Sequence, residues 1–355
     1  MSAQNNRPTQ RTIADLLGIS VSAVSRALAN DAQMAEQTRV LVRKAADELG
    51  YAPDRAAQRL RTGRTFAINL ILPPHSEILG FGNLLVGGIT AGLSGTPFDL
   101  LVWPDHGNDQ SVDRMAQIVG NNLADGIIFS RTFVDDSRIR FLSETGFPFV
   151  THGRSESALP HAYVDYDNNA FGERAAEKLI ARGARRLAIL LPDDRYMFHH
   201  HILHGFMAAV RTAGVNHEVL DGIILDSESH VISEQLGKRL RTKNPPDGFI
   251  FPGDVSGLAG LAAIQDNGLI VGRDVHVMVK QTSGVFDHVR PRVDSLYEDL
   301  SAAGRSLAKM MVDRINGVPV TDLQCVLPSM TLPIQTPSAV DQAATAHVFN
   351  SQRLS

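Results

Sequence analysis

Cysteine is almost absent from this chain: the one residue in 355, Cys325, lies in the apolar run LQCVL. A single thiol cannot form an intrachain disulfide framework, and this composition is typical of proteins in a reducing compartment. Long apolar runs are also missing, since none approaches the roughly 18–20 residues that span a bilayer, and the N-terminal stretch MSAQNNRPTQ is polar. We therefore expect a soluble, cytoplasmic protein with no signal peptide and no membrane partner.

The sequence motifs of common enzymes are missing as well. No GxSxG, P-loop or HExxH pattern occurs, and the glycines of LVGGITAGLSG do not follow a strand with the spacing of a dinucleotide fingerprint. A histidine cluster lacks nearby cysteine or carboxylate ligands, and its consecutive members cannot all face one ion on a helix: His199, His200, His201 and His204. We expect no enzymatic activity, no cofactor and no metal site.

The excess of acidic residues is confined to one part of the chain. Residues 1–64 hold 10 Lys/Arg and 6 Asp/Glu, which gives +4, whereas the remainder holds 24 and 32, which gives −8 and a total of −4. A basic N-terminal segment attracts phosphate groups while an acidic body is repelled by them. This asymmetry favours a nucleic-acid partner for the N-terminal segment alone.

Two short helices joined by a tight turn are predicted within residues 9–29. Gly18 can take the left-handed conformation that ends a helix, and Ser20 can cap the next helix by accepting a backbone N–H. This arrangement is typical of a helix-turn-helix, whose second helix lies in the major groove of DNA. The apolar residues have the spacing of two helix faces: Ile13, Leu16, Leu17, Val24 and Leu28.

The second of these helices would direct Val21, Ser22, Ser25 and Arg26 outward while Val24 packs inward. Ser22 and Arg26 are four residues apart and therefore share a face. Arginine commonly reads guanine O6 and N7. We expect Arg26 to contact base edges, Ser25 a phosphate, and Val21 and Ser22 to set the preference for neighbouring bases.

A third helix is predicted to begin at Thr38 and to end at Gly50, with one apolar face formed by Val40, Leu41, Ala45 and Leu49. The charged, helix-compatible stretch DRAAQRLR and the linker TGRT follow. This stretch is shorter than the roughly 12–15 residues that an isolated helix needs in water. We expect residues 54–64 to form a hinge helix and linker, with the helix at 55–61 forming only on operator DNA.

The runs IADLLGISVSAVSRAL and TRVLVRKAADELGYAPDRAAQRL closely resemble the headpiece of the LacI/GalR family of bacterial repressors. The resemblance continues at lower density to about Pro333, and VKQTS…RPRVDSLYEDL is similar to the α-glucoside-type regulators of that family. It implies a sugar- or metabolite-controlled transcription factor that binds double-stranded, palindromic operator DNA as a homodimer. We expect Leu60 to wedge into the minor groove at the operator dyad. The predicted DNA contacts are Thr9, Ser20, Val21, Ser22, Ser25, Arg26, Tyr51, Ala57 and Leu60.

Strands alternate with helices after residue 65, which implies parallel sheets with right-handed crossovers. Apolar runs predict strands at 66–72, 99–103, 126–129, 148–151, 187–191, 248–251 and 275–279. Helices are predicted at 84–93, 169–182, 204–213, 232–241 and 256–267. The expected fold class is therefore α/β, and the resemblance implies a two-lobe periplasmic-binding-protein-like effector domain of doubly wound sheets behind a small all-α headpiece.

The expected domains are the headpiece at 1–53, the hinge at 54–64, the effector-binding and dimerisation domain at 65–335, and a disordered tail at 336–355. The resemblance places the N-lobe at 65–163 plus 293–326 and the C-lobe at 164–290 plus 327–335. A small effector, a mono- or disaccharide, would lie in the cleft at the carboxyl ends of the strands.

Strand ends and the register of the family suggest which residues line this cleft. Carbohydrate recognition needs planar polar groups for paired hydrogen bonds and aromatic rings for the apolar face of the sugar. The predicted effector-binding residues are Glu77, Phe81, Arg131, Tyr163, Arg195, His200, Asp254, Gln281 and Glu298.

The chain departs from the family pattern at three places in this region. Ile202 replaces the arginine of the RxxGF motif, Val279-Lys280-Gln281 stands where Gly-Tyr-Asp is usual, and Gly253 replaces the asparagine before Asp254. An effector held by that arginine and that aspartate in typical members cannot be held in the same way here.

These observations bear on three possible functions. A ligand-controlled repressor explains both the headpiece and the two-lobe body. A sugar-binding protein without DNA function would have a signal peptide and no headpiece, and a sugar kinase would need a phosphate loop and a catalytic base. We therefore predict a sugar-responsive, sequence-specific transcriptional repressor.

Overall fold

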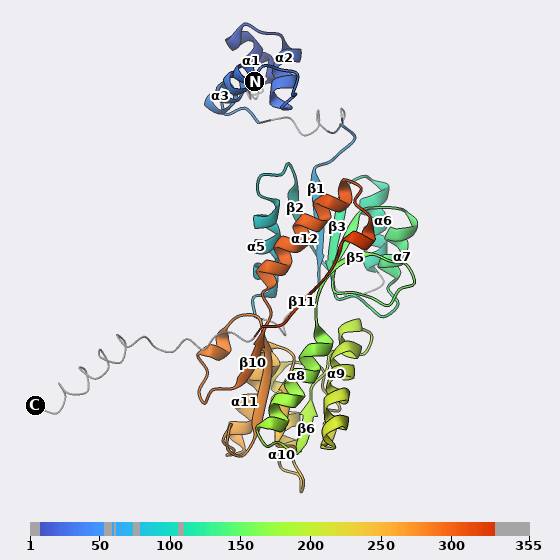
Figure 1. Cartoon of the computed structure of the whole chain (residues 1–355), viewed down its shortest axis with the longest axis vertical. Coiled ribbons are helices and arrows are strands. Elements are labelled where there is room, and N and C mark those ends of the chain that lie inside the picture. The colour runs from blue at the N-terminus through green and yellow to red at the C-terminus, as the bar shows by residue number, and fades with distance from the viewer. Residues whose placement is uncertain (1–7, 53–58, 60–61, 74–78, 106–109, 331–355) are drawn as a thin grey trace, which may run out of the picture. The chain divides into compact units, whose positions relative to one another are not determined.

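Figure 1 shows a computed structural model of the chain, which describes residues 8–52, 59, 62–73, 79–105 and 110–330. The chain divides into two compact units, Met1–Phe66 and Ala67–Ser355. Three residues with predicted roles, Ala57, Leu60 and Glu77, lie outside the described ranges, as do most of the predicted hinge and the tail at 336–355.

The N-terminal unit contains α1 (Gln10–Leu17), α2 (Val21–Leu28) and α3 (Glu36–Glu48). Gly18 ends α1 with a φ of +66°, and the Ser20 hydroxyl caps α2 by accepting the Ala23 N–H at 3.1 Å, so both predicted turn roles are confirmed. The core of the unit consists of seven buried residues: Ile13, Ala14, Val24, Ala27, Val42, Ala45 and Ala46.

The predicted apolar face of the third helix is wrong in part. The helix begins at Glu36 rather than Thr38, and Val40 and Leu41 are 58% and 51% exposed. The core-facing side is centred on Val42, Ala45 and Ala46, which are spaced three and four residues apart. Leu41 lies four residues before Ala45 but at the exposed margin of this face, and Val40 lies outside it.

The C-terminal unit begins with a six-stranded sheet of order β11-β5-β4-β3-β1-β2. Its strands are β1 (Ala67–Leu72), β2 (Asp99–Pro104), β3 (Gly126–Ser130), β4 (Phe149–His152), β5 (Ala162–Tyr166) and β11 (Gln324–Leu327). Helices α5 (Phe81–Leu93) and α12 (Leu300–Ile315) pack together on one face, while α6 (Gln110–Gly120) and α7 (Ser137–Glu144) cover the other (Figure 1).

A second, five-stranded sheet has the order β10-β9-β8-β6-β7. Its strands are β6 (Arg186–Ile189), β7 (Asn216–Val219), β8 (Gly248–Phe251), β9 (His276–Gln281) and β10 (Asp294–Tyr297). Helices α8 (Asn168–Ala181) and α9 (Met197–Ala213) cover one face, and α10 (Ser229–Leu240) and α11 (Asp254–Asp266) the other. Two 3₁₀ turns, Val285–Asp287 and Val320–Asp322, complete the described elements.

Every strand pair in both sheets is parallel, as the alternation of strands and helices predicts. The lobe boundaries need three corrections. The expected boundaries at 163/164 and 326/327 fall inside β5 and β11, which both belong wholly to the first sheet. The segment 293–326 was assigned to the first lobe, but β10 pairs with β9 in the second sheet, so the chain returns to the first lobe only after Tyr297.

The chain passes between the sheets three times, and the three crossings lie side by side. The Asp167 N–H donates to the Leu327 carbonyl at 2.9 Å, and Tyr297 and Met330 exchange two backbone hydrogen bonds of 2.7 and 2.8 Å. Asp167 also caps α8 by accepting the Ala170 N–H. The crossings therefore form one hydrogen-bonded strip between the lobes.

Candidate functional site

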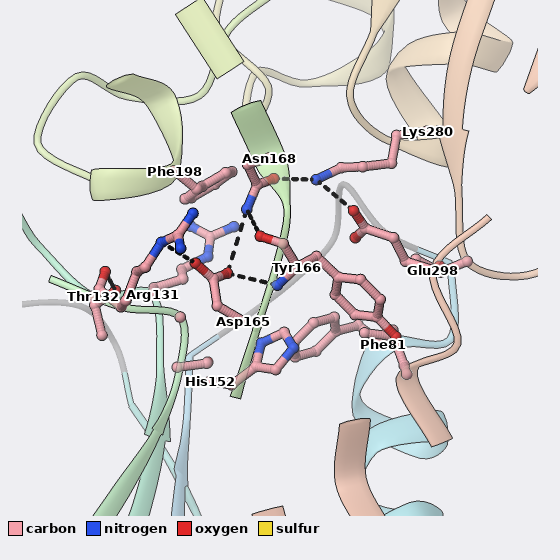
Figure 2. Close-up of a pocket in the computed structure, with 15 residues that line it drawn as sticks. Phe81, Arg131, Thr132, His152, Asp165, Tyr166, Asn168, Phe198, Lys280 and Glu298 are labelled. Carbon is pink, nitrogen blue, oxygen red and sulfur yellow. Dashed lines mark hydrogen bonds and ion pairs between the residues drawn. The ribbon is translucent and has the colours of Figure 1, made fainter. Parts of the chain in front are cut away.

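A cavity with about 620 Å³ of empty volume lies between the two sheets (Figure 2). It is lined from the carboxyl ends of β3, β4, β5 and β9, from the crossing segments, and from the first turns of α5, α9 and α12. This is where ligands bind in open parallel sheets. The lining residues are Phe81, Ser130, Arg131, Thr132, His152, Gly153, Arg154, Asp165, Tyr166, Asn168, Phe198, Lys280, Thr282, Glu298 and Leu300.

Lys280 joins two of the crossings inside this cavity. Its ammonium nitrogen lies 2.9 Å from Asn168 Oδ1 and 3.4 Å from Glu298 Oε1 (Figure 2). The Ser329 hydroxyl, from the third crossing, donates to the same Glu298 oxygen at 3.2 Å. Burial raises the pKa of Glu298, although the charge of Lys280 opposes this effect.

Asp165 forms a second polar centre at the end of β5. Its Oδ2 lies 3.2 Å from the Arg154 guanidinium, and its Oδ1 accepts hydrogen bonds from the Tyr166 N–H at 2.8 Å and the Asn168 amide at 3.3 Å. Burial raises the pKa of Asp165 to about 7, because the desolvation of the carboxylate outweighs its attraction to Arg154, and the Glu298 charge raises it further.

Arg131 and its neighbours connect the lobes at another edge of the cavity. Arg131 has a φ of +56°, pairs with Asp226 of the second lobe and lies against the Tyr196 ring. Phe133 stacks on the same ring at 5.3 Å, and the Met197 N–H donates to the Thr132 carbonyl at 3.0 Å. The first lobe therefore contacts the second through hydrogen bonds, an ion pair and stacked rings.

Aromatic side chains supply an apolar wall. The Phe81 and His152 rings meet edge to face at 5.7 Å, and His152 meets Tyr166 at 6.4 Å. The Tyr166 hydroxyl donates to the Asp299 carbonyl at 2.7 Å, which fixes the ring beside the cavity. Aromatic rings beside paired polar groups can bind a molecule that has both hydroxyls and an apolar face.

Of the predicted effector residues, Phe81, Arg131 and Glu298 line the cavity, and five others do not. Tyr163 lies two residues before Asp165 on β5, away from the carboxyl end of the strand. Arg195 is 66% exposed and pairs with Asp193. His200 lies outside the cavity and donates through Nε2 to the Asp194 carbonyl at 2.8 Å.

The remaining two are buried beneath the surface of the cavity. Asp254 accepts hydrogen bonds from the hydroxyls of Thr282 and Ser283 at 2.9 and 3.0 Å. The Gln281 amide donates to the Ser295 hydroxyl at 2.8 Å. Both side chains therefore organise the loop that follows β9.

Sequence reasoning missed ten polar or aromatic residues that line the cavity: Ser130, Thr132, His152, Arg154, Asp165, Tyr166, Asn168, Phe198, Lys280 and Thr282. One signal for them was present, because a lysine interrupts the otherwise apolar strand HVMVKQ. A buried lysine requires a partner, and therefore marks a polar site.

The N-terminal unit presents the predicted DNA-contacting residues on α2. Val21 is exposed, the Ser22 hydroxyl lies 2.9 Å from that of Ser20, and the Arg26 guanidinium pairs with Asp31 at 2.7 Å. Outside α2, Thr9 caps α1 through its hydroxyl, and Tyr51 packs against the core of the unit.

Comparisons with known proteins match both units. Residues 9–54 match the model of bacterial regulatory proteins of the lacI family, and residues 176–333 match that of a periplasmic binding protein-like domain. The transcriptional regulator RafR of Escherichia coli is 31% identical over 327 residues, with 88% of this chain and 94% of that protein covered. The regulator CelR of Thermobifida fusca is 28% identical over 332 residues, which cover 91% and 96%.

Solved structures show the same arrangement. A complex of the regulator CelR with cellobiose is 26% identical, with a TM-score of 0.66 and coverage of 91% of this chain and 98% of that one. A lac repressor dimer bound to operator and an anti-inducer is 19% identical, with a TM-score of 0.73 and coverage of 92% and 97%, and shows the fold alone. Among the residues described, none of the helices has both the length and the apolar character needed to cross a bilayer.

Proposed function

Because this chain belongs to the LacI family of bacterial regulatory proteins, we propose that it represses transcription from a palindromic operator and that a small carbohydrate controls its DNA binding. The observation that carries the proposal is the cavity between the lobes, where three ion pairs lie beside an aromatic wall. A related regulator, CelR, has been solved with cellobiose. The family also supports a homodimer as the DNA-binding form.

On the DNA side, α2 enters the major groove with Arg26 on base edges and Ser25 on a phosphate. Val21 offers apolar contact, for example to a thymine methyl, and Ser22 contacts a neighbouring base. Thr9 and Tyr51 position the helix pair against the backbone. The predicted DNA contact of Ala57 and the predicted minor-groove wedge of Leu60 belong to the segment outside the described residues.

On the effector side, the sugar lies between Phe81, Arg131 and Glu298, together with the lining residues Asp165 and Lys280. The polar groups that the sugar reaches lie on the crossings or hydrogen-bond to residues of the crossings, and together they involve all three. A ligand that changes the hydrogen bonds of Asp165, Glu298 and their partners would favour one angle between the lobes. Two operator half-sites tolerate little change in the spacing of the headpieces, so this angle controls DNA affinity.

The experiment uses the full-length protein. Thermal unfolding in the presence of neutral mono- and disaccharides should identify a sugar that raises the melting temperature, because a ligand of the folded state stabilises it. The same sugar should then change operator affinity by about 5–150-fold, and operator should change sugar affinity by the same factor. Sugar binding without any change in operator affinity would refute the proposed control.

A further inference from the structure

The charged groups of the cavity occur as matched pairs. Arg131 faces Asp226, Arg154 lies 3.2 Å from Asp165, and Lys280 lies 3.4 Å from Glu298. The Lys280 and Glu298 side chains are 8% and 7% exposed, so this pair is withdrawn from water. Each of the three cations that line the described cavity therefore lies beside a carboxyl group of the protein.

This balance discriminates against anionic ligands. A buried charge is costly unless it gains a partner of opposite charge, and a ligand carboxylate or phosphate would have to compete with Asp165 or Glu298 for a cation already engaged. The displaced carboxylate would stay in the same cavity and repel the ligand. A hydroxyl group avoids this conflict, because it both donates and accepts hydrogen bonds without adding charge.

Lys280 and Glu298 also keep hydrogen-bonding capacity. An ammonium group has three donors, and Lys280 has two partners, Asn168 and Glu298. Glu298 Oε1 accepts from Lys280 and Ser329, which leaves Oε2 for a ligand within the described part of the site. A donor and an acceptor this close together suit two neighbouring hydroxyls of a sugar ring.

The surroundings of the pair fit the same kind of ligand. The Phe198 ring lies 5.9 Å from the Lys280 ammonium nitrogen and lines the cavity, so it offers an apolar surface beside the polar pair. Ile202, at the position where the family pattern has an arginine, is fully buried in the core of the second lobe. The Ile202 side chain supplies no cation to the site, and Lys280 supplies one from β9 instead.

We propose that the Lys280–Glu298 pair binds two neighbouring hydroxyls of the effector, and that the cavity accepts uncharged sugars and rejects aldonates, uronates and sugar phosphates. This inference rests on the proposed sugar-binding function and specifies its ligand class. It assigns specificity to the balance of charge rather than to any single residue.

The first test is a set of matched ligands on the full-length protein. Isothermal titration would compare glucose with glucuronate and glucose 6-phosphate, and maltose and cellobiose with their aldonate forms. We expect at least one neutral sugar to bind at least tenfold more tightly than its anionic counterparts. Equal or tighter binding of the anionic member would overturn the inference while leaving carbohydrate control intact. Absence of binding by every sugar would instead overturn the proposed effector class, and the inference with it.

The second test changes the pair itself. The double variant Lys280→Met/Glu298→Met removes both charges together and so leaves neither one unpaired in the interior. We expect it to keep its fold, as judged by circular dichroism, and to lose at least tenfold in affinity for the neutral sugar. The matched control is Lys309→Met/Asp313→Met, which removes a 2.8 Å ion pair on the exposed face of α12 and should leave affinity unchanged. Native affinity in the first double variant would show that the pair is only structural.

The third test reverses the selectivity and does not depend on the stability of the double variant. Glu298→Gln keeps the shape of the side chain but leaves the Lys280 charge unbalanced. The affinity ratio of neutral to anionic sugar should fall at least tenfold in this variant. An unchanged ratio would refute the charge-balance argument.

Discussion

Replacing Arg26 by alanine should weaken operator binding by about 1–3 kcal/mol and relax base specificity at one position of each half-site. In the protein without DNA, the Arg26 guanidinium pairs with Asp31 at 2.7 Å, and the arginine side chain is 51% exposed. An ion pair this exposed is screened by water and contributes little. A bidentate contact with guanine is worth more, so DNA should displace Asp31 with a net gain.

The same comparison predicts the effect of Asp31→Asn. Asparagine keeps an oxygen that can accept the Gln33 N–H, as Asp31 does at 2.9 Å, but no longer holds Arg26 by charge. It also removes a negative charge beside the recognition helix. Operator binding should therefore strengthen slightly, because only an exposed and screened ion pair has been lost.

The assay is fluorescence anisotropy with the full-length protein and a palindromic operator selected by that protein from a random-sequence library. Operators with single-base changes, each measured over a range of KCl concentrations, separate base reading from phosphate attraction. Lys44→Ala is the matched control, because it removes one exposed positive charge from α3 rather than from α2. If Arg26→Ala weakens every DNA sequence by the same factor, as the control should, then Arg26 contacts phosphate and the reasoning is wrong.

Three further perturbations have defined outcomes. Gly88→Ala would place a Cβ 2.3 Å from the Ser301 carbonyl oxygen, whereas Gly87→Ala on the same helix meets no atom within 4 Å. In urea denaturation, Gly88→Ala should lower the free energy of unfolding by about 1–3 kcal/mol or more, and Gly87→Ala should raise it by up to about 1 kcal/mol. Equal effects of the two substitutions would contradict this packing. Because the pKa of Asp165 is raised to about 7 by burial, the native state retains a proton that the unfolded state loses near pH 4. The contribution of Asp165 to the free energy of unfolding should thus fall as pH rises from about 4 to 7, and this pH dependence should vanish in Asp165→Asn. A difference in free energy between the two proteins that does not change with pH would disprove this. Leu60→Ala should weaken operator binding while sparing nonspecific DNA, as measured by competition, and equal losses would indicate a simple linker.

The headpiece could be predicted largely from sequence because its signals are local. Gly18 and Ser20 act within one turn of their own positions, through a left-handed φ and a side-chain cap. The error at Val40 and Leu41 has a different origin. Several apolar residues in that helix could define a face, and only packing against α1 and α2 selects the one that contains Val42.

The central strands were predictable for a related reason. Fully buried parallel strands such as GFIF of β8 are continuous apolar runs, and the sequence alone marks them. One central strand, β5, was missed because its sequence AYVDY mixes polar with apolar residues. The strands β7, β10 and β11 were missed because they lie at sheet edges and are mostly exposed or half-buried. Their pairing is decided by neighbours distant in sequence, which no local pattern reports.

The cleft shows how a difference of one residue decides whether a side chain reaches the ligand. Gln281 was predicted to line it, but successive strand residues point to opposite faces of a sheet. Val277 and Val279 pack in the cluster that contains α10 and α11, so Gln281 shares their face and hydrogen-bonds to the Phe286 N–H. Lys280 shares the opposite face with Met278, which packs in the cluster of α8 and α9.

The face of the sheet to which Lys280 points could be worked out from the sequence once the two neighbouring helix pairs are assigned to their faces. The partners of Lys280 could not be worked out in this way. Asn168 precedes Lys280 by 112 residues, and Glu298 follows it on a different crossing. Both residues contact Lys280 only because the two sheets end at the same strip of chain. A lysine in an apolar strand predicts that a partner exists, since an unpaired buried ammonium would be too costly. Here the partners that satisfy it belong to the segments that connect the lobes, so the group that neutralises the Lys280 charge lies where the proposed effector control of the lobe angle would act.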